Sequence, residues 1–278
     1  MVKQKKKISS IFAGIYSFLI YLFLYIPIFV MMVFSFNNSK YKGNWVGFTL
    51  KWYDELFKDK SILDSVYTTL IVALISAFLA VIIGTVTAVA LFKMNSGYKK
   101  LLLDLTYIPM VNPDIVIGVS LLSLFVICHI KLGYVTLILA HITFNVPYVI
   151  FAVLPKLSQL DPNLEEAALD LGATHTQAFF KVLLPELMPG ILTGFMLSLT
   201  MSLDDFIVSF FTTGSGVATL SIKIYSMTKR GVSPKINALS TILFIITVIV
   251  VGISQFKTYR EEKLKNLKKS KMLNMEEY

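Results

Sequence analysis

Six long runs of apolar residues make up most of the sequence. They lie near residues 11–35, 65–92, 101–127, 134–154, 189–212 and 236–256. A helix needs about 20 apolar residues to cross the ~30 Å hydrocarbon layer of a bilayer, and every run is long enough. Charged residues form only 15% of the chain, whereas soluble domains carry about 25%. The sequence therefore predicts an all-α polytopic membrane protein with six transmembrane helices.

The positions of lysine and arginine predict how these helices are oriented. An even number of spans places both termini on one side of the membrane, and basic residues favour the cytosolic side. With the termini inside, sixteen of the 26 basic residues fall on the inner side. We therefore expect a cytosolic basic tail over residues 1–10, a transmembrane domain over 11–256 and a charged cytosolic tail over 257–278. The net charge of +9 then reflects span ends and tails, not a nucleic-acid partner.

Signatures of covalent chemistry are missing from the sequence. The single cysteine, Cys128, has no partner for a disulfide, and the three histidines lack the spacing of a metal site. The sequence also has no phosphate-binding glycine loop, no HExxH motif and no nucleophile elbow. We therefore expect a transport subunit that is not an enzyme and that binds no metal or cofactor itself.

A polar segment, "EEAALDLGATHTQAFFKVLLP", separates the fourth and fifth apolar runs. Its two leading glutamates suit the positive end of a short helix, and Gly172 permits a turn that other residues resist. Residues 175–184 can form a second short helix, which Pro185 is expected to end. The segment predicts a helix–turn–helix loop over about 158–188 that projects into the cytosol.

The spacing within this loop resembles the EAA motif of ABC importer permeases. The residues that carry the resemblance are Glu166, Ala167, Ala168, Gly172, Val182, Leu184 and Pro185. The one departure from the motif is Val182, where the family has isoleucine. The resemblance implies a type I ABC importer permease fold whose cytosolic coupling helices dock on a separate ATP-binding subunit. That subunit would use ATP and Mg²⁺, and this chain would not.

Two adjacent acids, Asp204 and Asp205, lie within the fifth apolar run. A charged residue in a span costs ~2.5–3.5 kcal/mol on insertion scales, so its retention needs a reason. On a continuous helix, one polar stripe follows Ser198, Ser202, Asp205, Ser209 and Thr212. We expect Asp205 and Ser202 to line a watery path, with Asp204 at its edge. The alternative is that the acids cap a helix or pack against a partner permease.

The third run contains the sequence "IPMVNPDIVIG". Pro109 and Pro113 each remove a backbone donor, which opens a helix locally. Asp114 follows directly, and transporters often build a cation site from a broken helix and a buried acid. We expect Asp114 to contribute to the path; the alternative is that it only caps the restarted helix.

Two other polar patterns are weaker. His141, Asn145 and Tyr148 form a row at helical spacing in the fourth run, which indicates interhelix hydrogen bonding. In the first outer loop, "LKWYDELF" places Trp52 and Leu56 one turn apart, as in a short helix lying at the membrane surface. Contact with an outer partner is the alternative for this helix.

The residue types near the acids suggest the charge of the substrate. Carboxylates compensate ammonium groups, and aromatic rings attract cations through their faces. The aromatic residues available are Phe206, Phe210, Phe211, Trp45, Trp52 and Tyr225. These residues favour an organic cation over an anion such as phosphate or sulfate.

Four stretches extend the resemblance to a narrower group. "NSKYKGNWVGFTLKWY", "NPDIVIGVSLL", "SLDDFIVSFFTTG" and "IKIYSMTKRGVSPKINALSTI" are similar to PotC-type permease subunits of bacterial spermidine/putrescine ABC importers. The similarity runs from about residue 15 to 256. It implies a plasma-membrane complex with a PotB-like permease, two PotA-like ATP-binding subunits and an extracytoplasmic PotD-like binding protein. It also implies that Trp52, Asp114, Asp204 and Asp205 line the polyamine path.

Other readings of the sequence stay open at this point. Fold and coupling loop do not fix the cargo, so an ABC permease for another small solute is the first alternative. An ion-coupled secondary transporter should show an internal repeat, and the sequence shows none. A membrane-embedded enzyme would need a nucleophile–base pair or metal cluster, which the sequence does not offer.

Overall fold

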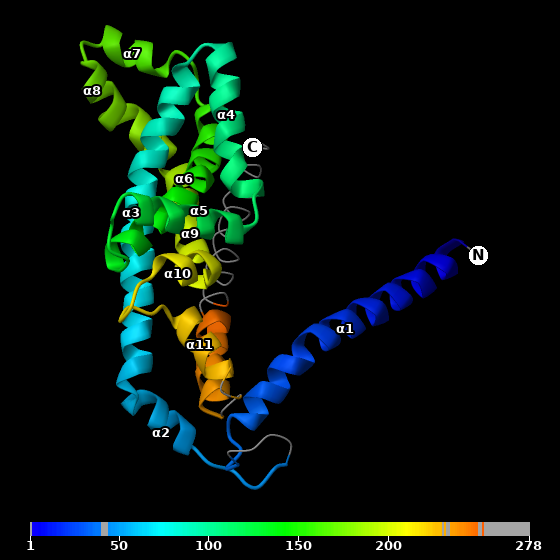
Figure 1. Ribbon diagram of the computed structural model, residues 1–278. Helices are drawn as coiled ribbons and strands as arrows, with labels where there is room; N and C mark the ends of the chain where they lie inside the picture. Colours follow the sequence, from blue (N-terminus) through cyan, green and yellow to red (C-terminus); the bar gives the residue numbers. More distant parts are fainter. Residues whose placement is uncertain (1, 40–43, 230, 232–233, 250–251, 253–278) are drawn as a thin grey trace. The chain divides into compact units, whose positions relative to one another are not determined.

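The computed structural model describes residues 2–39, 44–229, 231, 234–249 and 252 (Figure 1). Within these residues the regular secondary structure is helical, and the β-structure is one isolated bridge between Asn37 and Phe48. The chain divides into two compact units, one formed by residues 1–59 with 227–278 and the other by residues 60–226. The all-helical prediction is therefore confirmed for the described residues.

The helices follow one another along the chain with short connections. Their bounds are α1 (Val2–Phe34), α2 (Lys51–Lys58), α3 (Lys60–Lys93), α4 (Ser96–Val111), α5 (Asp114–Ile127), α6 (Tyr134–Leu157), α7 (Leu164–Asp170), α8 (His175–Ala178), the π-helix η1 (Phe179–Leu183), α9 (Leu184–Asp204), α10 (Ile207–Thr212) and α11 (Leu220–Lys229). A further apolar helix spans Pro234–Ile249. The first helix begins at Val2, so the predicted tail over 1–10 continues the helix of the first span.

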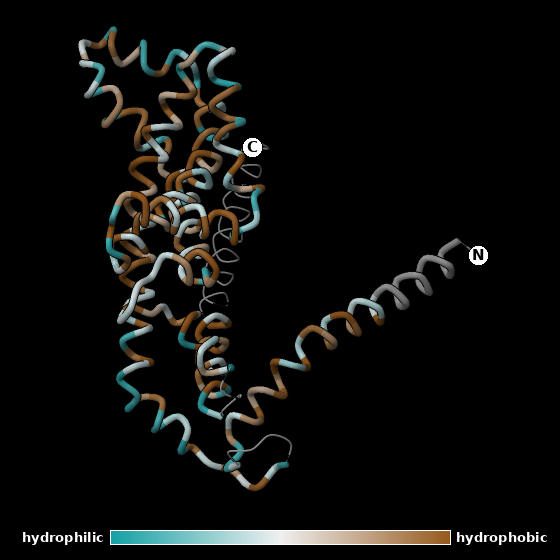
Figure 2. The backbone as a smooth tube through the Cα atoms, viewed as in Figure 1, coloured by the Kyte–Doolittle hydropathy of each residue, from teal (hydrophilic) through white to brown (hydrophobic). Residues whose placement is uncertain are grey.

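Several of these helices are long and apolar enough to cross a membrane. They are Gly14–Phe34, Lys60–Lys93, Tyr134–Leu157 and His175–Asp204, and the bent pair α4 and α5 can form one more span. In Figure 2, the part of α1 from Gly14 to Phe34 is coloured mainly as hydrophobic residues. The sixth predicted run, 236–256, and the predicted tail over 257–278 reach beyond the described residues, so the number of six spans stays a prediction.

The centre of the second unit is a bundle of α3, α6 and α9. Glycines allow the helix backbones to approach closely there, as is common between membrane helices. A Cβ atom on Gly84 of α3 would lie 2.6 Å from Cβ of Val149 on α6, and one on Gly194 of α9 would lie 3.2 Å from Cα of Val149. Around this contact pack the fully buried Ala80 and Val153. Helices α4, α5 and α10 pack against α6 of this bundle.

The predicted break in the third apolar run is confirmed and is sharper than expected. Helices α4 and α5 meet at an angle of 104°. Asn112 and Pro113 are both extended, with ψ values of 141° and 137°. Proline disfavours the helical conformation of the residue before it and cannot donate a backbone hydrogen bond. The chain therefore turns at this point, and Asp114 becomes the first residue of α5.

The prediction of one continuous fifth span over 189–212 is wrong. Helix α9 ends at Asp204, Asp205 is extended with ψ 127°, and α10 begins at Ile207. The polar stripe of the sequence is therefore not one face of one helix. The Asp205 side chain bonds to the backbone of the next helix, which offers the chain an alternative to continuing α9.

The expectation that Pro185 ends a helix is also wrong, because α8, η1 and α9 form one helical stretch over His175–Asp204. The stretch contains a π-turn at Phe179–Leu183, where the N–H of Leu184 donates to the carbonyl of Phe179, five residues earlier. Proline normally clashes with the carbonyl four residues before it. The wider π-turn accommodates Pro185 without breaking the helix.

The first unit contains the predicted short helix as α2. Trp52 and Leu56 of this helix are buried, and the Trp52 indole donates to the backbone carbonyl of Asn37 over 2.8 Å. The Tyr53 hydroxyl lies 2.6 Å from the Ser35 hydroxyl. Helix α2 therefore packs on the loop that follows α1, with Trp52 as its anchor.

Candidate functional site

A pocket of about 150 Å³ lies where the two broken helices meet in the second unit. Its lining comes from α4, α5, α6, α9, α10 and the α9–α10 connection. The lining residues are Pro109, Asp114, Ile117, Phe144, Tyr148, Met201, Asp204, Asp205, Phe206 and Val208. Asp114 and the adjacent pair Asp204 and Asp205, about 90 residues further along the chain, thus share one pocket.

Close packing of α5 on α10 brings these segments together. A Cβ atom on Gly118 of α5 would lie 2.9 Å from the Phe211 ring and 3.4 Å from Cα of Val208. Val208 also packs with Phe125 of α5 and Ala140 of α6 in one buried apolar cluster. A side chain at position 118 would meet the Phe211 ring, so glycine allows the start of α5 with Asp114 to lie close to the break before α10.

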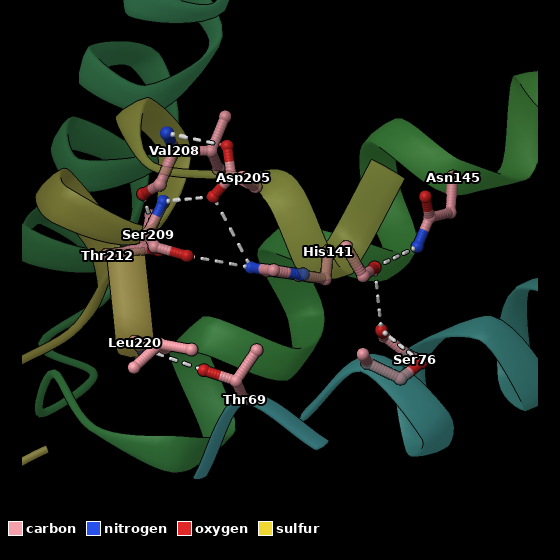
Figure 3. Close-up of polar contacts among 11 residues, drawn as sticks. Thr69, Ser76, His141, Asn145, Asp205, Val208, Ser209, Thr212 and Leu220 are labelled. Atoms are coloured by element: carbon pink, nitrogen blue, oxygen red, sulfur yellow. Dashed lines mark hydrogen bonds and ion pairs between the residues drawn. The ribbon is translucent and has the colours of Figure 1, made fainter. Parts of the chain in front are cut away.

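Asp205 lies at the break itself and is held by the first turn of α10. Its carboxylate accepts the backbone N–H of Val208 over 3.2 Å and that of Ser209 over 2.7 Å (Figure 3). Only 8% of the side chain is exposed. The capping role named as an alternative for the acid pair is therefore observed for Asp205, and the same carboxylate also lines the pocket.

Asp114 and Asp204 complete the acidic wall of the pocket. Both residues are exposed, whereas Asp205 is largely covered. Asp114 lies in the first turn of α5, directly after Pro113. Three carboxylates around one small, partly enclosed volume favour a compensating positive charge, because burying charge without a partner is costly.

Two residues predicted for the path lie elsewhere. Ser202 is 2% exposed, and its hydroxyl lies 3.2 Å from that of Ser76 and accepts the Asn145 amide over 2.7 Å. Trp52 belongs to the first unit. Neither residue is among those lining the pocket, and their part in a path stays a prediction.

Aromatic residues border the acids. Phe206 lines the pocket, and its ring lies 4.7 Å from that of Tyr225 and 5.6 Å from that of Phe210. Phe144 and Tyr148 of α6 also line it, and our sequence analysis did not assign them to the path. Their i, i+4 spacing on an apolar helix was the available signal.

The row of polar residues in α6 forms interhelix hydrogen bonds, as predicted for His141 and Asn145. His141 Nε2 lies 3.0 Å from the Ser209 hydroxyl of α10, and the Asn145 amide donates to Ser202 of α9. Tyr148 instead faces the pocket. Among the described residues, no group of three or more His, Cys, Asp or Glu side chains has the arrangement of a metal site.

The second notable feature is the helical pair α7 and α8, which lies at the C-terminal end of α3 (Figure 1). The turn between them passes through Gly172, whose φ of +84° favours glycine. Thr174 then caps α8, because its hydroxyl accepts the Gln177 N–H over 3.3 Å while the Gln177 side chain accepts the Thr174 N–H over 3.1 Å. Both halves of the predicted helix–turn–helix are thus present.

The residues of the EAA motif differ in exposure. Glu166, Ala167, Gly172 and Pro185 are exposed, Leu184 is half-buried, and Ala168 is buried at 8%. Leu171, at the tip between the two helices, is 90% exposed. This loop therefore leaves both the Glu166 carboxylate and the apolar Leu171 side chain uncovered.

Glu165, next to Glu166, is paired with basic residues of the same chain. Lys93 Nζ lies 2.8 Å and 2.7 Å from its two carboxylate oxygens, and His175 Nδ1 lies 3.6 Å from one of them. The hydrogen bond from Lys93 lowers the pKa of the Glu165 carboxyl, although partial burial acts in the opposite direction. The two neighbouring glutamates therefore have different environments, which the sequence did not distinguish.

These features agree with the comparison to known proteins. The chain belongs to the family described as "Binding-protein-dependent transport system inner membrane component", whose model matches residues 80–257. It is thus a permease subunit of an ABC transporter and a multi-pass protein of the cell membrane.

Among its relatives, the chain is 42% identical to the spermidine/putrescine transport system permease protein PotC of Escherichia coli (strain K12), over 89% of this chain and 94% of that protein. It is 38% identical to the putrescine transport system permease protein PotI of the same strain, over 87% and 88% of the two chains. The fold is similar to a chain in the crystal structure of a bacterial ABC transporter involved in the import of alginate. That match has a TM-score of 0.71 and 15% identity, and it covers 90% of this chain and 96% of the other.

Proposed function

We propose that this chain is one permease subunit of an ATP-driven polyamine importer and forms half of its translocation path. The observation that carries the proposal is the single pocket walled by Asp114, Asp204 and Asp205. Relatives that are 42% and 38% identical are named for spermidine/putrescine and putrescine transport. The chemistry of the pocket and the names of the relatives therefore point to the same class of substrate.

The pocket suits a flexible molecule with several ammonium groups. Each carboxylate can accept charge-assisted hydrogen bonds from an ammonium group. Phe206 and Tyr148, which line the same pocket, offer ring faces to the cation and to its methylene chain. A phosphate or sulfate would meet three like charges instead, so an anionic substrate is disfavoured.

Ser202 and Trp52 support the path indirectly in this proposal. Ser202 hydrogen-bonds across the α3–α6–α9 bundle three residues before Asp205, and so fixes the end of α9. Trp52 anchors α2 to the loop after α1, and we propose that this element forms part of the outer entrance.

Movement is proposed to be driven by a separate, PotA-like ATP-binding subunit. The coupling segment over about 158–188 would dock on it, with Glu166 pairing with a basic residue and Leu171 burying its exposed side chain. Gly172 supplies the turn that presents both residues, Ala167 and Ala168 belong to α7, and Leu184 and Pro185 begin α9, which continues the stretch from α8. ATP and Mg²⁺ belong to that partner. A PotB-like permease and an extracytoplasmic PotD-like binding protein complete the complex.

The proposed topology follows from this docking. Helices α7 and α8 face the cytosol, both termini are cytosolic, and six spans cross the plasma membrane. The acidic pocket then lies between the cytosolic coupling segment and the outer face where the binding protein delivers its cargo.

The proposal is tested with the complete complex in proteoliposomes that take up radiolabelled spermidine or putrescine. Asp114→Asn, Asp204→Asn and Asp205→Asn are each expected to lower uptake by about tenfold or more, since a lost charge-assisted hydrogen bond costs ~1.5–3 kcal/mol. Asp104→Asn is the matched control, because Asp104 is an exposed acid of α4 that does not line the pocket. Wild-type uptake in all three pocket variants would refute the assigned path.

Docking has its own test, based on Glu166→Lys. The variant reverses an exposed charge, so it is expected to leave the permease folded while the ATP-binding subunit no longer co-purifies or no longer drives uptake. Asp64→Lys is the control, because Asp64 is an exposed acid of α3 outside the segment over about 158–188. An intact complex with normal uptake in Glu166→Lys would contradict the docking role.

A further inference from the structure

His141 is a fully buried imidazole beside the carboxylate of Asp205. The side chain is 0% exposed, and its Nε2 atom lies 3.0 Å from the Ser209 hydroxyl and 3.5 Å from Asp205 Oδ2 (Figure 3). Ser209 also gives its backbone N–H to the same Asp205 oxygen over 2.7 Å. One imidazole nitrogen therefore contacts both Asp205 and the residue that holds Asp205.

The contacts of the ring indicate which nitrogen carries hydrogen. Nε2 faces two oxygens, one of them in a carboxylate, so a hydrogen on Nε2 is favoured over one on Nδ1. Nδ1 has no hydrogen-bond partner among the described residues. If the hydrogen is on Nε2, Nδ1 carries none, so no N–H group of the ring is left without an acceptor. We therefore assign His141 as a donor toward α10.

The position of His141 is otherwise hard to explain by packing. A polar side chain inside a membrane bundle is costly unless it is hydrogen-bonded. The Nε2 contacts run to the broken end of the fifth span and not to the α3–α9 side of α6. On its other flank the ring lies 5.1 Å from that of Phe144, which lines the pocket. The imidazole thus contacts two residues that line the pocket, Asp205 and Phe144, without lining it itself.

We infer that His141 is a positioning residue, which fixes the Asp205 carboxylate for contact with the substrate. It holds the Asp205 carboxylate at the pocket wall, both directly and through Ser209. The capping bonds from Val208 and Ser209 fix the carboxylate from the α10 side only. The contact with His141 restrains it from the α6 side as well, so the acid faces the cation without reorganising. This inference rests on the proposed function and adds a residue that does not itself line the pocket.

The test compares variants in the complete complex, with uptake expressed per assembled complex. His141→Leu keeps the size of the side chain but removes the donor, and we expect about tenfold lower uptake. His141→Gln keeps a donor of similar reach and is expected to retain uptake within about threefold of wild type. Ser209→Ala removes the hydroxyl but keeps the backbone donor, and a ~2- to 10-fold loss is expected, the range for one neutral hydrogen bond.

Thr136→Val is the matched structural control. Thr136 lies on the same helix, is 0% exposed, and donates its hydroxyl to the Thr212 carbonyl of α10 over 2.8 Å. It links the same two helices without touching Asp205. We expect a lower melting temperature but uptake per complex close to wild type. Equal losses in Thr136→Val and His141→Leu would show that the bond between the helices matters and the positioning of Asp205 does not.

A double substitution tests whether His141 acts through Asp205. Asp205→Glu keeps the charge but displaces the carboxylate, so adding His141→Leu is expected to cause no further loss. Multiplied losses would overturn the inference, as would normal uptake in both His141→Leu and Ser209→Ala or equal losses in His141→Gln and His141→Leu. A wild-type complex without polyamine uptake would instead remove the proposed function, and the inference with it.

Discussion

Lys93 at the end of α3 forms an ion pair with Glu165 at the beginning of α7. The ammonium group of Lys93 lies 2.8 Å and 2.7 Å from the two carboxylate oxygens of Glu165. The two residues are 72 positions apart in the sequence. Helix α3 is also the longest described helix, with 34 residues, and it packs on both α6 and α9. The ion pair therefore connects the coupling segment directly to the bundle that carries the acidic pocket.

Charge reversal tests this connection. Lys93→Glu and Glu165→Lys are each expected to reduce ATP-driven uptake, and the double reversal is expected to recover part of it. The effect on folding should be small, since the Lys93 side chain is 53% exposed and such pairs contribute ~0.2–1 kcal/mol. Uptake and melting temperature are measured on the same samples. Single reversals with normal uptake, or a double reversal no better than either single one, would exclude a coupling role.

The same pair predicts a pH dependence. Because the pKa of Glu165 is lowered in the folded protein, the ionised carboxylate stabilises the fold. That contribution is complete above the ordinary glutamate pKa of 4.5 and is lost as the pH falls through the lowered folded pKa. The difference in melting temperature between wild type and Glu165→Gln should therefore be constant above this value and shrink below it. A difference that grows with acidity would have the wrong sign.

Gly172 offers a test of the turn between α7 and α8. Its φ of +84° is strained for residues with a Cβ atom, and no heavy atom lies within 4 Å of an added Cβ. Gly172→Val is therefore expected to raise the free energy of this turn conformation by about 1–2 kcal/mol. Because the turn is then less populated, we expect weaker co-purification of the ATP-binding subunit. Gly172→Asn, whose side chain tolerates this conformation, should bind more strongly than the valine variant. Equal binding by all three proteins would contradict the requirement for this turn.

Gly84 tests the close packing of the bundle. Gly84→Ala is expected to destabilise the protein by about 1–3 kcal/mol, because the new Cβ would meet the Val149 side chain at 2.6 Å. The change is read as a lower melting temperature in detergent. Adding Val149→Ala should recover part of the loss, whereas Gly97→Ala is the control because nothing lies within 4 Å of its Cβ. Similar losses at both glycines would count against a close contact between α3 and α6.

Local sequence signals predicted the helices and the coupling segment well. Long apolar runs correspond to long helices, and the proline pair around Asn112 corresponds to the bend between α4 and α5. The glycine at position 172 has the positive φ that its place in a turn required. These features depend on a few neighbouring residues, so the sequence alone carries the information.

The errors come from assuming uninterrupted helices. A regular helical period placed Ser202 and Asp205 on one face of one helix, but the helix ends at Asp204, and Ser202 is buried and bonded to α3 and α6. The stop is caused by the Asp205 side chain bonding to α10 and by the packing of α10 on Gly118. Pro185 was expected to end a helix, but the helix continues past it after a π-turn at Phe179–Leu183. Tertiary contacts contribute to the first outcome, whereas a local change in helical hydrogen bonding accompanies the second.

The most direct measurement is polyamine uptake by proteoliposomes that contain this chain with its partner permease and binding protein, in the presence and absence of the ATP-binding subunit. We predict uphill spermidine or putrescine uptake that requires both ATP and that subunit, and that falls about tenfold or more in Asp205→Asn. Uphill uptake by this chain alone, without any ATP-binding subunit, would contradict the account.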